Sequence, residues 1–487
     1  NKYVESRISY LLPSALLCLT AVSAIFISYS RESIGVLFIA GIFVVAIVVL
    51  TLSFPIFGFY FCFILSFFIF DLIRFFDTDL PVVVILDLMA YLTFMGVLIN
   101  KVVKKEPFWK NCRSPIVVLY VIILLYFIFV FFNPNGGNNE LYFLTIRRFV
   151  ALLLFFYCAI QLFKDYKSIK RFFITILALA VIVGLYACYQ QWIGLPKYEL
   201  DAMYKDPNTQ PLVLFYLALG SLRKASFLSD CSAYGLLMSG TSIVALTLFM
   251  KLKTSVINKL LLAFAAILLP VAMSFSGTRT ATIMLIAQIG LFILMTINEG
   301  KTILVAGCFI LLFIAVMIAP TYGNQVIPRL RSTFDFEDAS LNVRNVNRHD
   351  IQPYIYSHPI GGGVRTSGVI YEKYNIGHPL AGFPTDSGLL SMALDVGWIG
   401  LLLQCIAYFI VVQQGIRAYY KSRNPTYKAL LLAATLCVFG YIVAEYSQVA
   451  VGQIPGAFVI YGLIAVIIRL PQLEASPTPA QNINRKI

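Results

Sequence analysis

Four arginines of this chain have the chemistry needed to hold a phosphate group. Arg344 and Arg348 lie in the polar stretch NVRNVNRHDIQPYIYSHPIGGGV, within a chain of 487 residues that is otherwise mostly apolar. Arg223 lies in SLRKASFLSD, and Arg279 lies in the short stretch SFSGTRTAT. A guanidinium group binds phosphate oxygens through paired hydrogen bonds and keeps its charge in a low-dielectric setting. Since these stretches alternate with long apolar runs, we expect the arginines to hold a lipid diphosphate and to stabilise its charge as it leaves a sugar.

Three consecutive glycines, Gly361, Gly362 and Gly363, are a second candidate for binding this diphosphate. Successive backbone N–H groups without side chains over them can form an anion-binding concavity. The alternative for the triplet is an ordinary turn. For each arginine taken alone, the alternative is a side chain that merely extends toward lipid headgroups.

Other ionisable side chains form a further group of candidates. Acidic residues in or beside apolar runs are costly, which makes Asp87 and Glu445 functional candidates. Glu445 either binds sugar hydroxyls or ties helices together, and we group His358 with it as a candidate glycan-binding residue. The spacing of His349, His358 and His378, and that of the nine cysteines, matches no metal-binding motif. We therefore expect no metal ion and no cofactor.

The elements that must position these residues are apolar runs long enough to cross a membrane. The chain is 60% hydrophobic and 12% charged, with a mean hydropathy of +0.84, whereas soluble domains carry about a quarter charged residues. Each run matches the roughly 20 residues that a transmembrane helix needs. We therefore predict an all-α polytopic membrane protein with about 14 transmembrane helices, within a range of 12–14. The runs lie near residues 9–29, 34–54, 56–75, 81–100, 115–133, 147–163, 172–193, 231–250, 260–276, 279–298, 302–320, 387–412, 429–449 and 455–470.

The run at 9–29 is too long for a signal-peptide core and lacks a clear cleavage site, so we expect a retained first span. Basic residues account for the net charge of +14, and they cluster in short loops, as is typical of cytoplasmic loops. The charge therefore needs no nucleic-acid partner. We expect both termini in the cytoplasm and the long, charge-balanced loops on the opposite side of the membrane.

These expectations divide the chain into six regions. The predicted regions are N-terminal transmembrane helices in 1–193, an extracytoplasmic loop in 194–230, central helices in 231–320, a large extracytoplasmic catalytic loop in 321–386, C-terminal helices in 387–470 and a disordered cytoplasmic tail in 471–487.

Three segments of the chain resemble motifs of the O-antigen ligase/polymerase superfamily of membrane glycosyltransferases. They are LRKASFLSD, FSGTRTAT, and the long loop in which an arginine precedes HPIGGGV and DSGLLSMALDVGWIGLLL. The resemblance covers roughly residues 215–415. It implies an all-helical, C-type glycosyltransferase fold, a polyprenyl-diphosphate-linked glycan as donor and a metal-independent reaction. It also matches Arg223, Arg279 and Arg348 to the arginines that hold the diphosphate in that family.

The chain departs from the family at the residue that activates the acceptor hydroxyl. The family's histidine falls at Thr385 here, and Asp386 takes the place of an asparagine. Because threonine cannot serve as a general base, the candidate bases are Asp386 and His378.

The function we expect is a polymerase of a cell-surface polysaccharide in the bacterial inner membrane, with its active site on the periplasmic face. It would join a glycan from a polyprenyl diphosphate carrier to a sugar hydroxyl of another lipid-linked repeat unit, with inversion. The alternatives are a ligase that attaches polymer to lipid A-core or another final acceptor, and a lipid-linked glycan transporter or flippase. The expected partners are the lipid-linked donor, the glycan acceptor, the bilayer and a chain-length regulator or flippase.

Overall fold

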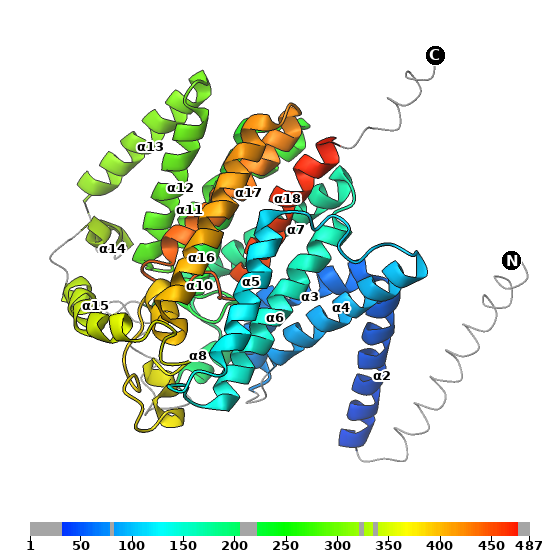
Figure 1. Ribbon diagram of the computed structural model, residues 1–487. Helices are drawn as coiled ribbons and strands as arrows, with labels where there is room; N and C mark the ends of the chain where they lie inside the picture. The colour runs from blue at the N-terminus through cyan, green and yellow to red at the C-terminus, as the bar shows by residue number, and fades with distance from the viewer. Residues whose placement is uncertain (1–31, 78–81, 205–221, 321–325, 335–338, 476–487) are drawn as a thin grey trace, which may run out of the picture.

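The computed structural model describes residues 32–77, 82–204, 222–320, 326–334 and 339–475 of the chain. Within these ranges every named element is a helix (Figure 1). The prediction of an all-α fold is therefore confirmed for this part of the chain. The predicted first span at 9–29 and most of the predicted tail lie outside the described residues.

The bundle is built from long helices joined by shorter ones (Figure 1). The long helices are α2 (Glu32–Ser53), α3 (Pro55–Phe75), α4 (Val84–Val103), α5 (Pro115–Val130), α6 (Asn139–Leu162), α7 (Tyr166–Trp192), α10 (Cys231–Lys251), α11 (Val256–Ser274), α12 (Arg279–Thr296), α13 (Gly300–Ile318), α16 (Gly388–Lys421), α17 (Pro425–Ala444) and α18 (Gly456–Ala475). The remaining helices are the short α8 (Lys197–Tyr204), α14 (Val326–Arg331), η1 (Ser332–Phe334) and η2 (Val369–Tyr374), and the polar α15 (Ala339–Ser357).

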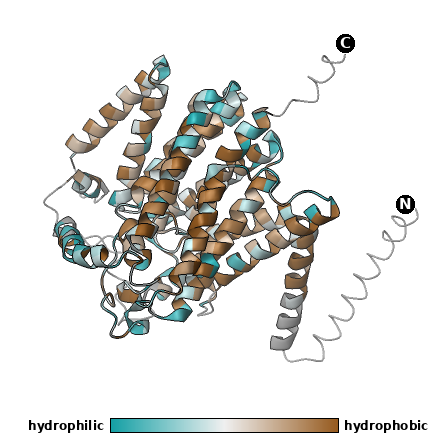
Figure 2. Ribbon diagram, in the orientation of Figure 1, coloured by the Kyte–Doolittle hydropathy of each residue, from teal (hydrophilic) through white to brown (hydrophobic). Residues whose placement is uncertain are grey.

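Eleven helices of the described part are long and apolar enough to cross a membrane. Two shorter apolar stretches are Gly41–Ser53, which is the second part of α2, and Pro115–Val130, which is α5. Every predicted run from 34–54 onward falls on a long helix, while the total of about 14 spans stays a prediction. α18 continues to Ala475, so the predicted start of the tail at 471 is too early. Figure 2 shows hydrophobic residues along the long helices and hydrophilic residues gathered mainly at their ends, as a bilayer requires.

The centre of the bundle is formed by α10, α17 and α18. In the most apolar stretch of α10 and of α18, 83% of the residues are buried, and in that of α17 the buried share is 72%. In the corresponding stretch of α13, only 6% of the residues are buried. A helix that is apolar on all sides and buried belongs to the core of the bundle. The outer helices, such as α13, are therefore the ones left to face lipid.

The predicted loop at 321–386 contains regular structure in its described part. α14, η1, α15 and η2 lie within it, and α15 alone has 19 residues. Figure 1 shows α8, α15 and the yellow segment that follows α15 at one end of the bundle, while α18 finishes at the other end. The polar segments named in the sequence analysis therefore gather at one end of the helices.

Candidate functional site

The turn between α11 and α12 brings together two of the predicted arginines. Arg223 donates from Nε to the Ser276 carbonyl oxygen at 2.7 Å and from Nη2 to the Thr278 hydroxyl at 2.8 Å. Arg279 is the first residue of α12 and follows Thr278 directly. Two arginines that are far apart in sequence are thus both placed at the turn 276–279.

Arg329 is a third arginine at this turn, and no sequence motif marks it as a site residue. Its Nε donates to the Gly277 carbonyl oxygen at 3.0 Å. Arg279, Arg329 and Thr278 line the same small pocket. The VIPRLR segment of α14 gives no sequence signal for this role, because only folding carries α14 to the turn. We call Arg223, Arg279 and Arg329 the arginine cluster.

A buried polar network lies behind the arginine cluster. The Lys224 backbone N–H donates to the Phe275 carbonyl oxygen at 3.0 Å, and burial lowers the pKa of the Lys224 side chain, an effect that the Glu199 charge opposes. Burial likewise raises the pKa of Glu199, although hydrogen bonds from Tyr186 at 2.6 Å and Gln190 at 2.7 Å stabilise its carboxylate. This network fixes α8 and α7 beside the segment that carries Arg223.

α15 supplies the other two predicted arginines. Arg348 donates from Nη2 to the Tyr446 carbonyl oxygen at 2.9 Å, and its guanidinium lies 4.5 Å from the centre of the Tyr446 ring. Arg344, four residues earlier and so on the same helix face, has its Nε 3.4 Å from Asp386 Oδ2. A predicted diphosphate-binding residue and a predicted base are therefore paired.

A side-chain contact joins this α15 group to the arginine cluster. The hydroxyl of Thr280, next to Arg279, lies 2.9 Å from the hydroxyl of Ser447, next to Tyr446. Tyr446 in turn holds Arg348. Contacts of neighbouring residues therefore connect the turn 276–279 to Arg348 on α15.

The glycine triplet is placed elsewhere and serves a different purpose from the one predicted. Gly361 N–H donates to the His358 carbonyl oxygen at 2.9 Å, Gly362 N–H to that of Leu394 at 2.8 Å, and Gly363 N–H to that of Asp395 at 3.1 Å. No N–H group of the triplet is left for a diphosphate. We therefore remove Gly361, Gly362 and Gly363 from the predicted anion site.

The triplet packs instead against a kink in α16. Gly397 interrupts the helical backbone there with φ 75° and ψ 175°. A Cβ on Gly361 would lie 2.5 Å from the Gly397 nitrogen, and a Cβ on Gly397 would lie 2.0 Å from the Pro359 carbonyl oxygen. Tyr126, near the end of α5, donates to the carbonyl oxygen of Val396 at 2.7 Å. Close backbone contact, which only glycine permits, thus fixes the direction of the first turns of α16.

The two candidate bases differ in how they are held. His378 Nε2 lies 3.0 Å from the Asn135 carbonyl oxygen, and its Nδ1 accepts the Leu380 N–H at 3.1 Å. Both ring nitrogens therefore contact backbone groups. Asp386 precedes Ser387, the N-cap of α16, and its side chain is 36% exposed. This difference favours Asp386 over His378 as the group that accepts a proton.

The candidate glycan-binding residues are also separated by the structure. Glu445 is buried, and its Oε2 accepts the N–H groups of Ala450 at 2.7 Å and Val451 at 2.9 Å. Its backbone carbonyl oxygen accepts the hydroxyl of Ser387 at 3.1 Å. These bonds favour the alternative in which Glu445 ties helices together. His358 is half-buried and stacks on Tyr354, with ring centres 3.9 Å apart, close to the α15 arginines in sequence.

The pairing of Asp87 was not predicted. Its carboxylate lies 3.1 Å from Arg147 Nε and 3.7 Å from Arg148 Nε, which joins α4 to α6. A charge buried among helices is tolerated when it is paired in this way. The geometry therefore assigns Asp87 to helix packing, away from the arginine cluster.

One comparison with known proteins bears on this site. Residues 263–405 match the family model described as O-Antigen ligase, a stretch that includes Arg279, Arg348 and Asp386. No curated protein matches the chain. This match supports the resemblance to the O-antigen ligase/polymerase superfamily that the sequence motifs indicated.

Proposed function

We propose that this protein is a polymerase of a cell-surface polysaccharide. It transfers a glycan from a polyprenyl diphosphate carrier to a sugar hydroxyl of a second lipid-linked repeat unit. The observation that carries this proposal is the arginine cluster at the turn 276–279, which the contact between Thr280 and Ser447 links to the segment that holds Arg348. Such a concentration of fixed positive charge suits a leaving diphosphate.

In this mechanism the arginine cluster and Arg348 bind the diphosphate oxygens of the donor. Negative charge builds on these oxygens as the bond between the anomeric carbon and the diphosphate breaks. Guanidinium groups already held by backbone and hydroxyl contacts need little reorganisation to stabilise that charge. The chemistry needs no group beyond these side chains and the two substrates.

Asp386 is the proposed general base. The acceptor oxygen attacks the anomeric carbon from the face opposite the diphosphate, and its proton passes to Asp386, so the configuration inverts. Arg344, whose Nε lies 3.4 Å from Asp386 Oδ2, orients the carboxylate. Ser387 and Glu445 fix the start of α16, on which this carboxylate depends.

A ligase is the second candidate function, because the matching family model carries that description. The same site would then transfer finished polymer to lipid A-core or another final acceptor. For either reaction we propose the bacterial inner membrane, cytoplasmic termini and an extracytoplasmic site. A chain-length regulator or a flippase would be its partner in the membrane.

A deletion strain separates these candidates, with surface glycan and lipid-linked glycan measured by gel electrophoresis. Loss of a polymerase leaves single repeat units on the final acceptor. Loss of a ligase leaves full-length polymer on the polyprenyl carrier, and loss of a flippase leaves single repeat units on the cytoplasmic side. Polymer that is made and attached normally would contradict both enzyme functions.

A further inference from the structure

The end of the bundle opposite the arginine cluster contains a cavity of about 670 Å³. Its walls come from the start of α5 and the ends of α16 and α18. α16 begins next to Asp386 and has 34 residues, which correspond to roughly 50 Å of helix. The cavity is therefore separate from the proposed active site.

The cavity is lined by more positive than negative charge. Its basic residues are Arg113, Arg417, Lys421 and Arg423, and Glu474 is the carboxylate among its described lining residues. Glu474 Oε1 accepts the backbone N–H groups of Arg423 at 2.8 Å and Asn424 at 2.9 Å. Within the described residues, the side chains of Arg113, Arg417 and Lys421 form no ion pair or hydrogen bond. Three cations thus remain available to an anion.

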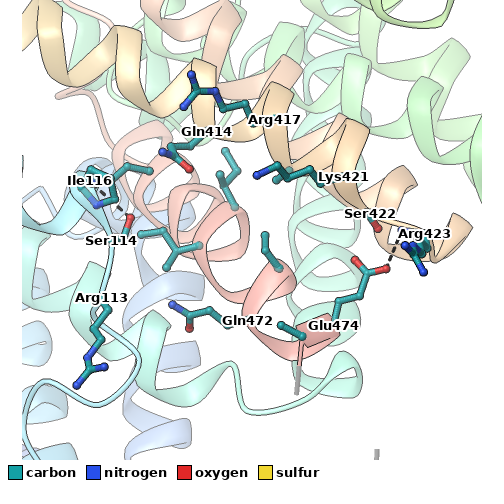
Figure 3. A pocket seen from close by; sticks show the side chains of 16 residues that line it. Arg113, Ser114, Ile116, Gln414, Arg417, Lys421, Ser422, Arg423, Gln472 and Glu474 are labelled. Carbon is teal, nitrogen blue, oxygen red and sulfur yellow. Dashed lines mark hydrogen bonds between the residues drawn. The ribbon is translucent and has the colours of Figure 1, made fainter. Parts of the chain in front are cut away.

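Helix periodicity places three polar side chains of α16 on the cavity. Gln414, Arg417 and Lys421 are three and four residues apart, and so they share one face of α16. Figure 3 shows side chains of α16 and α18 on facing sides of the cavity, with Arg113 beside the start of α5. Apolar residues, Ile116 and Ile467 among them, line the same cavity. The site therefore combines cations with an apolar wall at the ends of membrane-spanning helices.

We propose that this cavity binds the headgroup phosphate of an anionic phospholipid. Arg417 and Lys421, which share one face of α16, bind the phosphate oxygens, and the apolar wall takes the first part of the acyl chains. Basic pockets between transmembrane helices suit such headgroups, because charge and hydrophobic burial act together there. A free inorganic phosphate offers the same charge without the acyl chains, so the two ligands are distinguished by experiment.

The test is lipid binding to the full-length protein in detergent, measured by native mass spectrometry. Phosphatidylglycerol is titrated against phosphatidylcholine for the wild type and for the double variant Arg417→Ala, Lys421→Ala. We expect preferential retention of phosphatidylglycerol by the wild type. The double variant should bind it roughly tenfold or more weakly, the loss expected for two cations near an anionic surface.

The matched control is Lys104→Ala with Lys105→Ala, which removes two exposed lysines from the start of the loop between α4 and α5, at positions that do not line the cavity. It should bind phosphatidylglycerol like the wild type. If both double variants weakened phosphatidylglycerol binding equally, or if neither weakened it, the result would contradict the cavity as the lipid site. Displacement of the lipid by an equal concentration of inorganic phosphate would overturn the phospholipid as its ligand and leave a phosphate-ion site.

Discussion

At the scale of single residues, the proposed site depends on arginines that are held before any substrate arrives. Arg223 and Arg329 both donate to backbone carbonyl groups of the turn 276–279, and Arg279 starts the helix that leaves it. A side chain fixed in this way loses little conformational freedom when it binds phosphate. The two predicted arginines were found from short motifs, whereas Arg329 was not. Arg329 contacts Gly277 only because folding brings α14 to the turn, and no local sequence pattern predicts this contact.

Replacing Arg279 or Arg223 with alanine should abolish chain extension without lowering the amount of protein. Loss of one group that stabilises a developing anion costs about 100-fold or more in rate. Polymer length on gels, together with protein level on immunoblots, measures both effects. Lys104→Ala serves as the control for loss of an exposed cation. Normal polymer in both arginine variants would remove these residues from the mechanism.

Asp386→Asn should be far more damaging than Thr385→Ala, because only the first change removes a proton acceptor. Loss of a general base costs roughly 100-fold to 10,000-fold in rate. Transfer rates measured with purified protein and lipid-linked substrate test this difference. His378→Ala should slow the reaction much less, since both of its ring nitrogens contact backbone groups. The reverse order among these variants would contradict Asp386 as the base.

At the scale of elements, the kink in α16 determines where Asp386 stands. Length and hydropathy predict this helix, but the positive φ of Gly397 cannot be recognised from its neighbours in sequence. The same limit explains the glycine triplet: its N–H groups pair with Leu394 and Asp395, which a pattern of three glycines does not reveal. The sequence predicts a loop where α15 lies, because this segment is polar and contains Pro353.

Gly397→Ala should destabilise the protein by roughly 2 kcal/mol or more. It puts a side chain at positive φ, and its Cβ would lie 2.0 Å from the Pro359 carbonyl oxygen. Thermal unfolding in detergent measures the loss. Gly290→Ala is the control, because its Cβ would meet nothing within 4 Å in α12. Equal melting temperatures for the two variants would show that the close backbone contact does not matter.

At the scale of the whole molecule, two ends of one helical bundle carry different chemistry. The arginine cluster, α15 and Asp386 lie at one end, and the basic cavity lies at the other. The charge distribution predicts that the basic loops lie on one side of the membrane. Each predicted apolar run in the described part of the chain falls on a helix. Which helix ends meet could not be predicted, because contacts such as that between Thr280 and Ser447 join residues far apart in sequence.

The predicted orientation can be tested by labelling engineered cysteines in intact cells with a membrane-impermeant thiol reagent. In a background with all nine native cysteines replaced by serine, Glu372→Cys should be labelled from outside. Lys104→Cys should be labelled only after the membrane is opened, because it lies in a basic loop that we expect in the cytoplasm. Labelling of both positions from the same side would contradict the topology.

The most direct test of the central claim is binding of polyprenyl diphosphate, without a sugar, to the purified full-length protein. Arg329→Ala is the informative variant, because the structure alone points to this residue. We predict that Arg329→Ala and Arg279→Ala each weaken binding about tenfold, the loss expected for one charge-assisted contact of about 1.4 kcal/mol. Lys104→Ala should bind like the wild type. Unchanged affinity in both arginine variants would contradict the arginine cluster as the diphosphate site.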